Sequence, residues 1–173
     1  MCCLLTLSGI AFGQAVVSYN RPTNMAIKSL HQHNEVVRFA GNSFLGVVRT
    51  GRRNILQSSV VSWLKKDWRT TIVRAAMEVE DAGEYISNPE GNKTRLKAVV
   101  DAAIAEGLYA IIGWHSHHAE NYTEQAVAFF EEMAGQYSEY DNVIYEIYNE
   151  ALQVSWSSTV KPYAETVITA IRV

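Results

Sequence analysis

A polar pair, Asn149-Glu150, follows a run of β-branched and aromatic residues within VIYEIYNEAL at positions 143 to 152. Such a run is typical of a buried strand. A carboxylate at the end of a buried strand is costly unless it is paired or used. In a parallel α/β barrel the carboxyl ends of the strands form the active-site face, so Glu150 is a candidate general acid or base. A simple turn with a solvated acid is the alternative reading.

Glu146 is the nearest other carboxylate and, with a side-chain period of two, is expected to point to the same side as Glu150. Four residues of strand separate the two by roughly 13 Å. Carboxylates that cleave a glycosidic bond together stand about 5 to 9.5 Å apart. For that chemistry, Glu150 therefore needs a partner from another strand.

The elements that must position this pair follow a regular order. Strands are predicted at 36–40, 71–76, 108–114 and 143–148, and helices at 58–67, 94–106, 123–137 and 159–172. Strands that alternate with helices of this length imply a parallel sheet covered by helices. The fold class is therefore α/β, a partial TIM (β/α)8 barrel with about four βα units, because a complete barrel needs about 250 residues.

Local signals support three of these helices. Gly107 follows helix 94–106 at a typical C-terminal stop, and Pro162 lies near the first turn of helix 159–172, where a missing N–H costs little. One face of helix 123–137 is apolar at helical spacing. The residues of that face, which we expect to point inward, are Ala126, Phe129, Phe130 and Met133.

The composition is that of an ordinary globular domain, with 173 residues, 48% hydrophobic and 19% charged. The net charge of −3 leaves no basic surplus for nucleic acid, and no polybasic run is present to hold a membrane. No apolar stretch reaches the ~20 residues of a membrane span. We therefore expect neither nucleic acid nor membrane as a partner.

The N-terminal segment 1–15 is apolar and ends in small residues, which predicts a secretory signal and a secreted protein. Its positive n-region is missing, and a buried N-terminal strand is the alternative. Residues 16–34 are polar and irregular and are interpreted as a leader or as a cap over the barrel floor. Residues 35–173 form the barrel domain.

Three motifs, taken together, resemble those of the family 5 glycoside hydrolases. They are Asp67-Trp68 with IVRAAM at 72–77, LYAIIGWHSH at 108–117, and YEIYNE at 145–150. The likeness is greatest to the endo-β-1,4-glucanases, or cellulases, of bacteria and some invertebrates. It implies a barrel enzyme that cleaves internal β-1,4-glucosidic bonds of cellulose or related β-glucans with retention, without metal or cofactor.

The same resemblance implies a role for each of four residues. Glu150 is the expected general acid/base, and Asn149 is expected to hold the 2-hydroxyl of the sugar. Arg74 is expected to brace the catalytic carboxylates, and a fixed guanidinium would keep a nucleophilic carboxylate ionised. His115 is expected to line the site and contact the substrate, although a core histidine is the alternative for this position.

Other readings of neighbouring residues remain open. The histidines at 115, 117 and 118 could form a metal site, but no carboxylate or cysteine stands at ligand spacing. The aromatic residues near the strand ends could stack on sugar rings or simply pack: Trp114, Tyr145 and Tyr148. The acids Glu78, Glu80 and Asp81 are interpreted as loop charges.

The chain departs from the family pattern at several points. Ser43-Phe44-Leu45-Gly46 replaces an aromatic pair, Gly113 replaces an acid, and Ala151 replaces a proline. The family nucleophile, a glutamate near the end of the seventh strand, has no counterpart in these residues.

Three hypotheses account for these departures. The chain is the N-terminal half of a cellulase, deficient in turnover alone and prone to self-association through open sheet edges. Alternatively it is a catalytically degenerate glucan-binding pseudoenzyme, or an incomplete sequence whose remainder lies elsewhere.

Overall fold

The computed structural model describes residues 39–44 and 58–172, which divide into two units, 39–116 and 117–172. The predicted secretory segment 1–15 and leader 16–34 lie outside the described residues, as do Leu45 and most of the predicted strand 36–40. The boundaries assigned to these segments therefore stay predictions.

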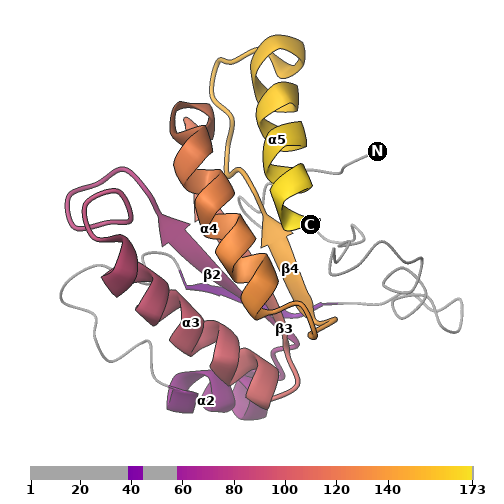
Figure 1. The fold of residues 1–173 in the computed structure, drawn as a ribbon. Coiled ribbons are helices and arrows are strands. Elements are labelled where there is room, and N and C mark those ends of the chain that lie inside the picture. Colours follow the sequence, from indigo (N-terminus) through magenta and orange to yellow (C-terminus); the bar gives the residue numbers. More distant parts are fainter. Residues whose placement is uncertain (1–38, 45–57, 173) are drawn as a thin grey trace, which may run out of the picture. The chain divides into compact units, whose positions relative to one another are not determined.

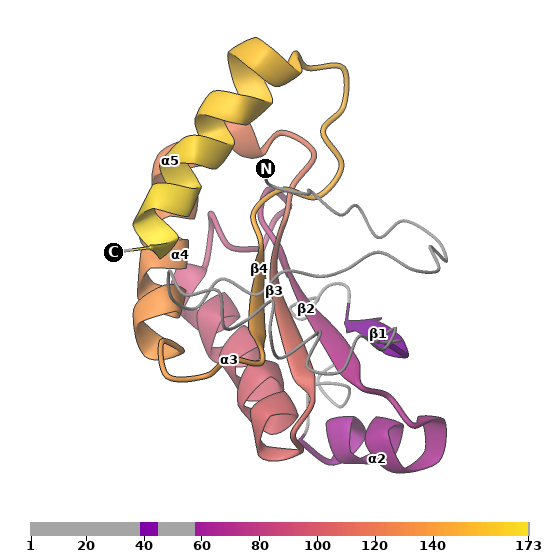
Figure 2. The ribbon, with the colours of Figure 1, turned by 90° about the vertical axis from the view of Figure 1, so that its right-hand side faces the viewer.

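The first unit alternates strands with helices, as expected. Its elements are β1 (Gly41–Phe44), α2 (Ser58–Trp68), β2 (Ile72–Glu78), α3 (Pro89–Ala105) and β3 (Tyr109–His115). The strands are parallel, and β2 lies between β1 and β3. Figure 1 shows α3 along one side of β2 and β3, with α2 beside its C-terminal part. Figure 2 shows the three strands side by side.

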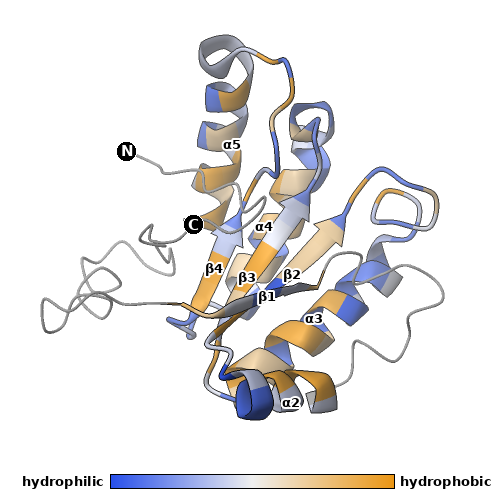
Figure 3. Cartoon of the chain, turned by 180° about the vertical axis from the view of Figure 1, so that it is seen from behind, coloured by the Kyte–Doolittle hydropathy of each residue, from blue (hydrophilic) through white to orange (hydrophobic). Residues whose placement is uncertain are grey.

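The register of the strands sorts their side chains onto two faces. One face carries the pair Arg74 and Ile111 and, four residues further along at the carboxyl end, the pair Glu78 and His115. The residues of the other face are almost all inaccessible to solvent: Val73, Ala75, Met77, Ala110, Ile112 and Trp114. In Figure 3 most of β2 and the first part of β3 are coloured as hydrophobic. Charged and polar side chains thus share one face, near the end where the strands stop.

The first strand begins later than predicted. It starts at Gly41 rather than ending before it, because Ala40 and Thr71 exchange hydrogen bonds and bring Gly41 opposite Ile72. A Cβ added to Gly41 would stand 2.9 Å from Cγ2 of Ile72, so glycine is needed for this close approach. The predicted strand 36–40 stops just before this glycine.

Helix α3 begins five residues before the predicted start at Thr94. Asn88 caps it by accepting a hydrogen bond from the Gly91 amide through Oδ1, at 3.2 Å, and Pro89 occupies the first turn. Gly107 adopts a φ of 67° just after the helix, which confirms the predicted stop. The polar composition of residues 88–93 hid the early start.

Asn92, inside the first turns of α3, is fully buried and joins the helix to the loop before it. Its Nδ2 donates to the carbonyls of Gly83 and Asn88, at 3.1 and 2.7 Å, and its Oδ1 accepts from Arg95 at 2.5 Å. One amide therefore satisfies three groups in a place where water cannot replace it.

Replacing Asn92 by alanine is expected to lower the free energy of unfolding by about 2–4 kcal/mol, because buried partners are left without hydrogen bonds. Asn88→Ala is the matched control, since it removes one exposed cap bond and should cost about 1 kcal/mol. Urea unfolding of both variants tests this. Equal losses would show that the buried amide contributes no more than the cap.

The second unit holds a 3₁₀ turn (Ala119–Tyr122), α4 (Thr123–Gln136), β4 (Val143–Glu146), a π-helical turn (Trp156–Val160) and α5 (Lys161–Ile171). The predicted inward face of α4 is confirmed, because Ala126, Phe129, Phe130 and Met133 are all fully buried. Helices α4 and α5 pack side by side (Figure 1). Pro162 lies in the first turn of α5, as expected.

Strand β4 is shorter than the predicted 143–148 and ends at Glu146. The spacing of roughly 13 Å inferred for Glu146 and Glu150 assumed continuous strand, so the alternation argument does not apply beyond Glu146. Within residues 39–44 and 58–172, no helix has both the length and the hydropathy to cross a bilayer.

Candidate functional site

Asn149 and Glu150 lie in the irregular segment that follows β4. Asn149 is buried, and the side chain of Glu150 is 36% exposed. The amide is thus held by the protein while the carboxyl group reaches solvent. This arrangement suits a group that must meet a ligand, and it differs from the fully solvated acid of the simple-turn reading.

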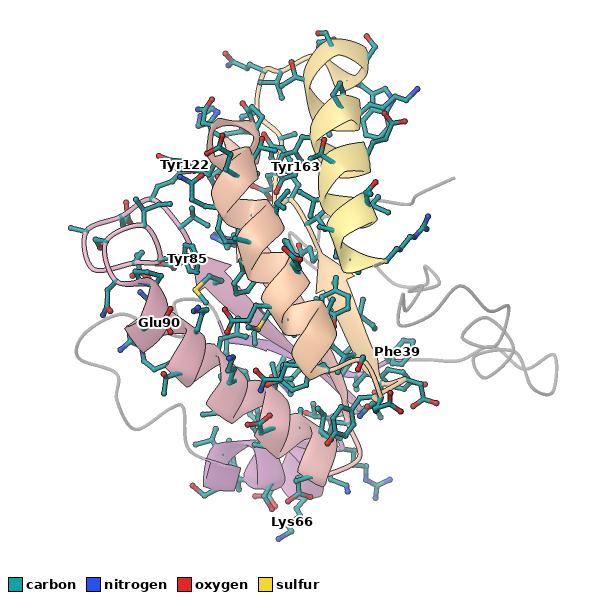
Figure 4. The ribbon with its side chains drawn as sticks, in the orientation of Figure 1. Phe39, Lys66, Tyr85, Glu90, Tyr122 and Tyr163 are labelled. Atoms are coloured by element: carbon teal, nitrogen blue, oxygen red, sulfur yellow. The ribbon has the colours of Figure 1, made fainter. Side chains whose placement is uncertain are left out.

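Hydrogen bonds to its backbone and side chains hold this segment in place. The Tyr163 hydroxyl, from α5, donates to the carbonyl of Ile147 at 2.6 Å, and Figure 4 labels Tyr163 in the side-chain view. Burial raises the pKa of the Tyr163 phenol, with a further contribution from Tyr148 and Glu120, so the phenol stays a neutral donor. The Tyr148 hydroxyl contacts Glu120 and, at 3.1 Å, the carbonyl of His117.

His117 contacts Glu150 directly. Its Nδ1 lies 3.1 Å from the backbone carbonyl oxygen of Glu150 and 3.9 Å from Oε2 of the same residue. The sequence reading considered His117 only as a possible metal ligand. Spacing along the chain could not reveal this contact, because 33 residues separate the two positions.

Arg74 lies in the middle of β2, in the first unit, and is 7% exposed. Its Nη1 is 3.4 Å from Oγ of Ser43, its partner in the β1–β2 register. A guanidinium this buried needs polar partners, and the position on the mixed face of the sheet supplies them. A functional assignment for Arg74 stays a prediction.

His115 is the last residue of β3. The predicted strand 108–114 placed it one residue later, in the following loop. It stands opposite Glu78 in the register, four residues beyond the Arg74 row and on the same face. The structure thus brings Arg74 and His115 to one face of the first unit. Asn149 and Glu150 belong to the second unit.

The three aromatic residues at the strand ends pack into the protein. Trp114 is fully buried, and its ring meets Tyr85 edge-on at 4.9 Å between centroids. Tyr148 is 1% exposed, and the half-buried Tyr145 donates to the carbonyl of Met133 at 3.3 Å. The packing alternative is therefore favoured over stacking on sugar rings.

The acids near the end of β2 differ from one another more than the prediction of loop charges allowed. Glu78 is the last residue of the strand, and Glu80 accepts a hydrogen bond from Ser116. Glu80 and Asp81 are both exposed and lie after the strand, as expected. The prediction was wrong for Glu78, because strand β2 runs two residues further than expected.

Glu84, in the loop between β2 and α3, is the acid that the sequence reading missed. It is 3% exposed, and Oε2 has no hydrogen-bond partner among the described residues. Burial, together with the neighbouring Glu78, raises the pKa of the Glu84 carboxyl to about 7. Nothing in the polar sequence around it distinguishes a buried acid from a solvated one.

In the described ranges 39–44 and 58–172, no group of three or more His, Cys, Asp or Glu side chains is arranged to hold a metal ion. The polar side chains described in and around this segment are those of Glu150, Asn149, His117, Tyr148 and Tyr163. They provide a carboxyl group, an amide, an imidazole and two phenols. Such groups can transfer protons and bind hydroxyl groups.

Comparison with known proteins gives a consistent result. Residues 22–173 match the family model described as Cellulase (glycosyl hydrolase family 5). Endoglucanase Z of Dickeya dadantii (strain 3937) is 58% identical over 135 residues, which make up 78% of this chain and 32% of that protein. The chain spans between 24% and 34% of the first four curated relatives that it matches.

Solved structures agree with this result. A structure from Cytophaga hutchinsonii has a TM-score of 0.74 and 46% identity, and the match covers 79% of this chain and 44% of that one. The Thermobifida fusca endoglucanase Cel5A (E5) catalytic domain, solved as its E355Q variant with cellotetraose, also has a TM-score of 0.74, with 35% identity. That match covers 81% of this chain and 46% of that chain. The predicted fold class, a partial (β/α)8 barrel, is confirmed.

Proposed function

This chain belongs to the cellulases of glycosyl hydrolase family 5, and on that premise we propose that it forms part of a retaining endo-β-1,4-glucanase. The substrate proposed is cellulose or a related β-glucan. The observation that carries the proposal is the placement of Asn149 and Glu150 after β4, with the amide buried and the carboxyl group reaching solvent. The cellotetraose bound to the Thermobifida fusca relative supports the substrate class.

Glu150 is proposed as the general acid that protonates the leaving glycosidic oxygen and then, as a base, activates water. Asn149 is proposed to bind the 2-hydroxyl of the sugar, where its hydrogen bond strengthens as the oxocarbenium-like transition state develops. Arg74 is proposed to keep a neighbouring carboxylate ionised, and His115 to contact substrate. No metal or cofactor takes part in this proposal.

The covalent step needs a second carboxylate, which attacks the anomeric carbon while Glu150 protonates the departing oxygen. In the family resemblance that carboxylate stands on a later strand, with no matching position in these 173 residues. We therefore expect the complete enzyme to combine this chain with the remaining strands of a family 5 barrel. Secretion, which would bring such an enzyme to its polysaccharide, is part of the same proposal.

A chimera tests the function. Residues 39–172 replace the corresponding segment of the Dickeya dadantii Endoglucanase Z, and reducing sugar released from carboxymethyl cellulose is measured. We expect turnover by the chimera and none by the 173-residue chain alone. Robust turnover by the 173 residues alone would mean that a nucleophile lies within them.

A glucan-binding protein without turnover is the second candidate. Gly113, which pairs with Ala76 in the core of the sheet and replaces the acid usual in the family, favours it. A folded chimera that binds cellulose but releases no sugar would support this candidate over the enzyme.

A further inference from the structure

We propose that His117 is a positioning residue for Glu150, with its Nδ1–H directed at the backbone carbonyl and toward the carboxyl group of that residue. The proposed role in fixing the direction of the acid can be tested on the chain itself. Only its catalytic consequence rests on the proposed function. The two residues come from different segments of the second unit, the one before its 3₁₀ turn and the one after β4.

The hydrogen bond identifies the tautomer of His117. A carbonyl oxygen can only accept, so at 3.1 Å the Nδ1 atom must carry the proton. A neutral imidazole then has its lone pair on Nε2. The ring is therefore a donor toward Glu150 and offers an acceptor on its other edge.

The same Nδ1 also limits where the Glu150 side chain can go. The Nδ1 atom of His117 lies 3.9 Å from Oε2 of Glu150. The carboxyl group of Glu150 therefore turns back toward the backbone carbonyl of the same residue, so that both groups face one N–H. The backbone of His117 is held in turn, because its carbonyl accepts from Tyr148, two residues before Glu150. The single Tyr148 proton is shared between this carbonyl and Glu120, so the two segments meet through one N–H bond and one shared O–H bond.

Two charged groups near this contact pair with each other. His118 lies 3.7 Å from Glu120, and Glu120 accepts from Tyr148. His118 is thus drawn to a different carboxylate from the one that His117 contacts. His118 therefore provides a matched control for substitutions of His117. The two side chains are adjacent in the chain and similarly exposed, 48% for His118 and 41% for His117.

The consequence for catalysis follows from geometry. A general acid acts only within hydrogen-bond reach of the atom it protonates, and small misplacements cost large factors in rate. Without His117, the carboxyl group of Glu150 should sample more directions. We expect kcat to fall about 10-fold and KM to change little, because the acid works in the transition state.

Nitrogen-15 NMR of the unmodified 173-residue chain tests the tautomer. The expected spectrum has a protonated Nδ1 and an unprotonated Nε2 for neutral His117. A protonated Nε2 in the neutral ring would overturn the proposal, and this arm needs no variant to fold.

Substitutions then test the positioning. In His117→Asn the amide nitrogen can occupy the place of Nδ1, whereas His117→Gln moves it one carbon further away. Carbon-13 signals of the Glu150 carbonyl and carboxyl groups should shift in H117Q, stay near the parent values in H117N, and be unaffected by H118Q. Equal shifts in H117N and H117Q, or none in either, would contradict a positioning role.

The chimera separates this proposal from the proposed function. If it is active, H117Q should lose about 10-fold in kcat and H117N should recover most of it. If it is inactive while the NMR results stand, the enzyme assignment fails and the positioning of Glu150 survives.

Discussion

Replacing Glu150 by glutamine in the active chimera is expected to lower kcat on carboxymethyl cellulose by about 10²- to 10⁴-fold, the range typical of a lost general acid. Glutamine has nearly the same shape, and the backbone carbonyl that accepts from His117 is unchanged. The amide cannot give a proton to the leaving oxygen. The loss should therefore appear in kcat without a loss of folding.

The nature of the leaving group sharpens this test. A dinitrophenyl β-cellobioside needs little protonation of its leaving oxygen, so E150Q should impair its cleavage far less in the step that breaks the glycosidic bond. Glu146→Gln is the matched control, because Glu146 ends β4 and is also half-buried. Turnover of carboxymethyl cellulose that survives E150Q would remove Glu150 from the mechanism.

The stability of the chain is expected to fall as the pH rises from about 4.5 to about 7, and Glu84 is the cause. Its carboxyl has a pKa of about 7 in the folded protein, raised from 4.5 by burial and by Glu78. In that pH window the unfolded chain releases the proton while the folded chain retains it. The contribution of Glu84 is complete below pH 4.5 and is lost once the pH passes about 7.

The size of this effect is on the order of 3 kcal/mol, since the pKa rises from 4.5 to about 7 and one pKa unit is worth about 1.4 kcal/mol. The neighbouring charges partly oppose each other, because Glu78 and Asp81 raise the pKa of Glu84 and Arg95 lowers it. Urea unfolding at pH 4.5, 6 and 8 measures the change.

Glu84→Gln should remove most of this pH dependence and stabilise the chain above pH 7, because a glutamine side chain is neutral at every pH. Asp81→Asn is the matched control, an exposed acid in the same loop whose charge adds only the smallest of the contributions to the pKa of Glu84, so it should weaken the pH dependence only slightly. An unchanged pH profile in E84Q would show that the buried carboxyl group is not the source.

The helices could be predicted from the sequence because their signals are local. Apolar spacing gave the inward face of α4, and Gly107 gave the end of α3. The motif around Asn149-Glu150 likewise indicated the family. It also indicated the candidate acid, because residue types alone reveal a carboxylate that follows an apolar run. The order of strands and helices by itself implies a parallel barrel.

Tertiary structure decided the features that depend on residues far apart in the chain. Gly41 begins a strand because it pairs with Ile72 of β2, and Glu84 keeps a proton to about pH 7 because the fold buries it beside Glu78. The contact between His117 and Glu150 joins positions 33 residues apart. Register, burial and such contacts arise only when distant segments pack, so no local pattern encodes them. The sequence thus specified which groups are available for chemistry, and packing decided how they are oriented and protonated.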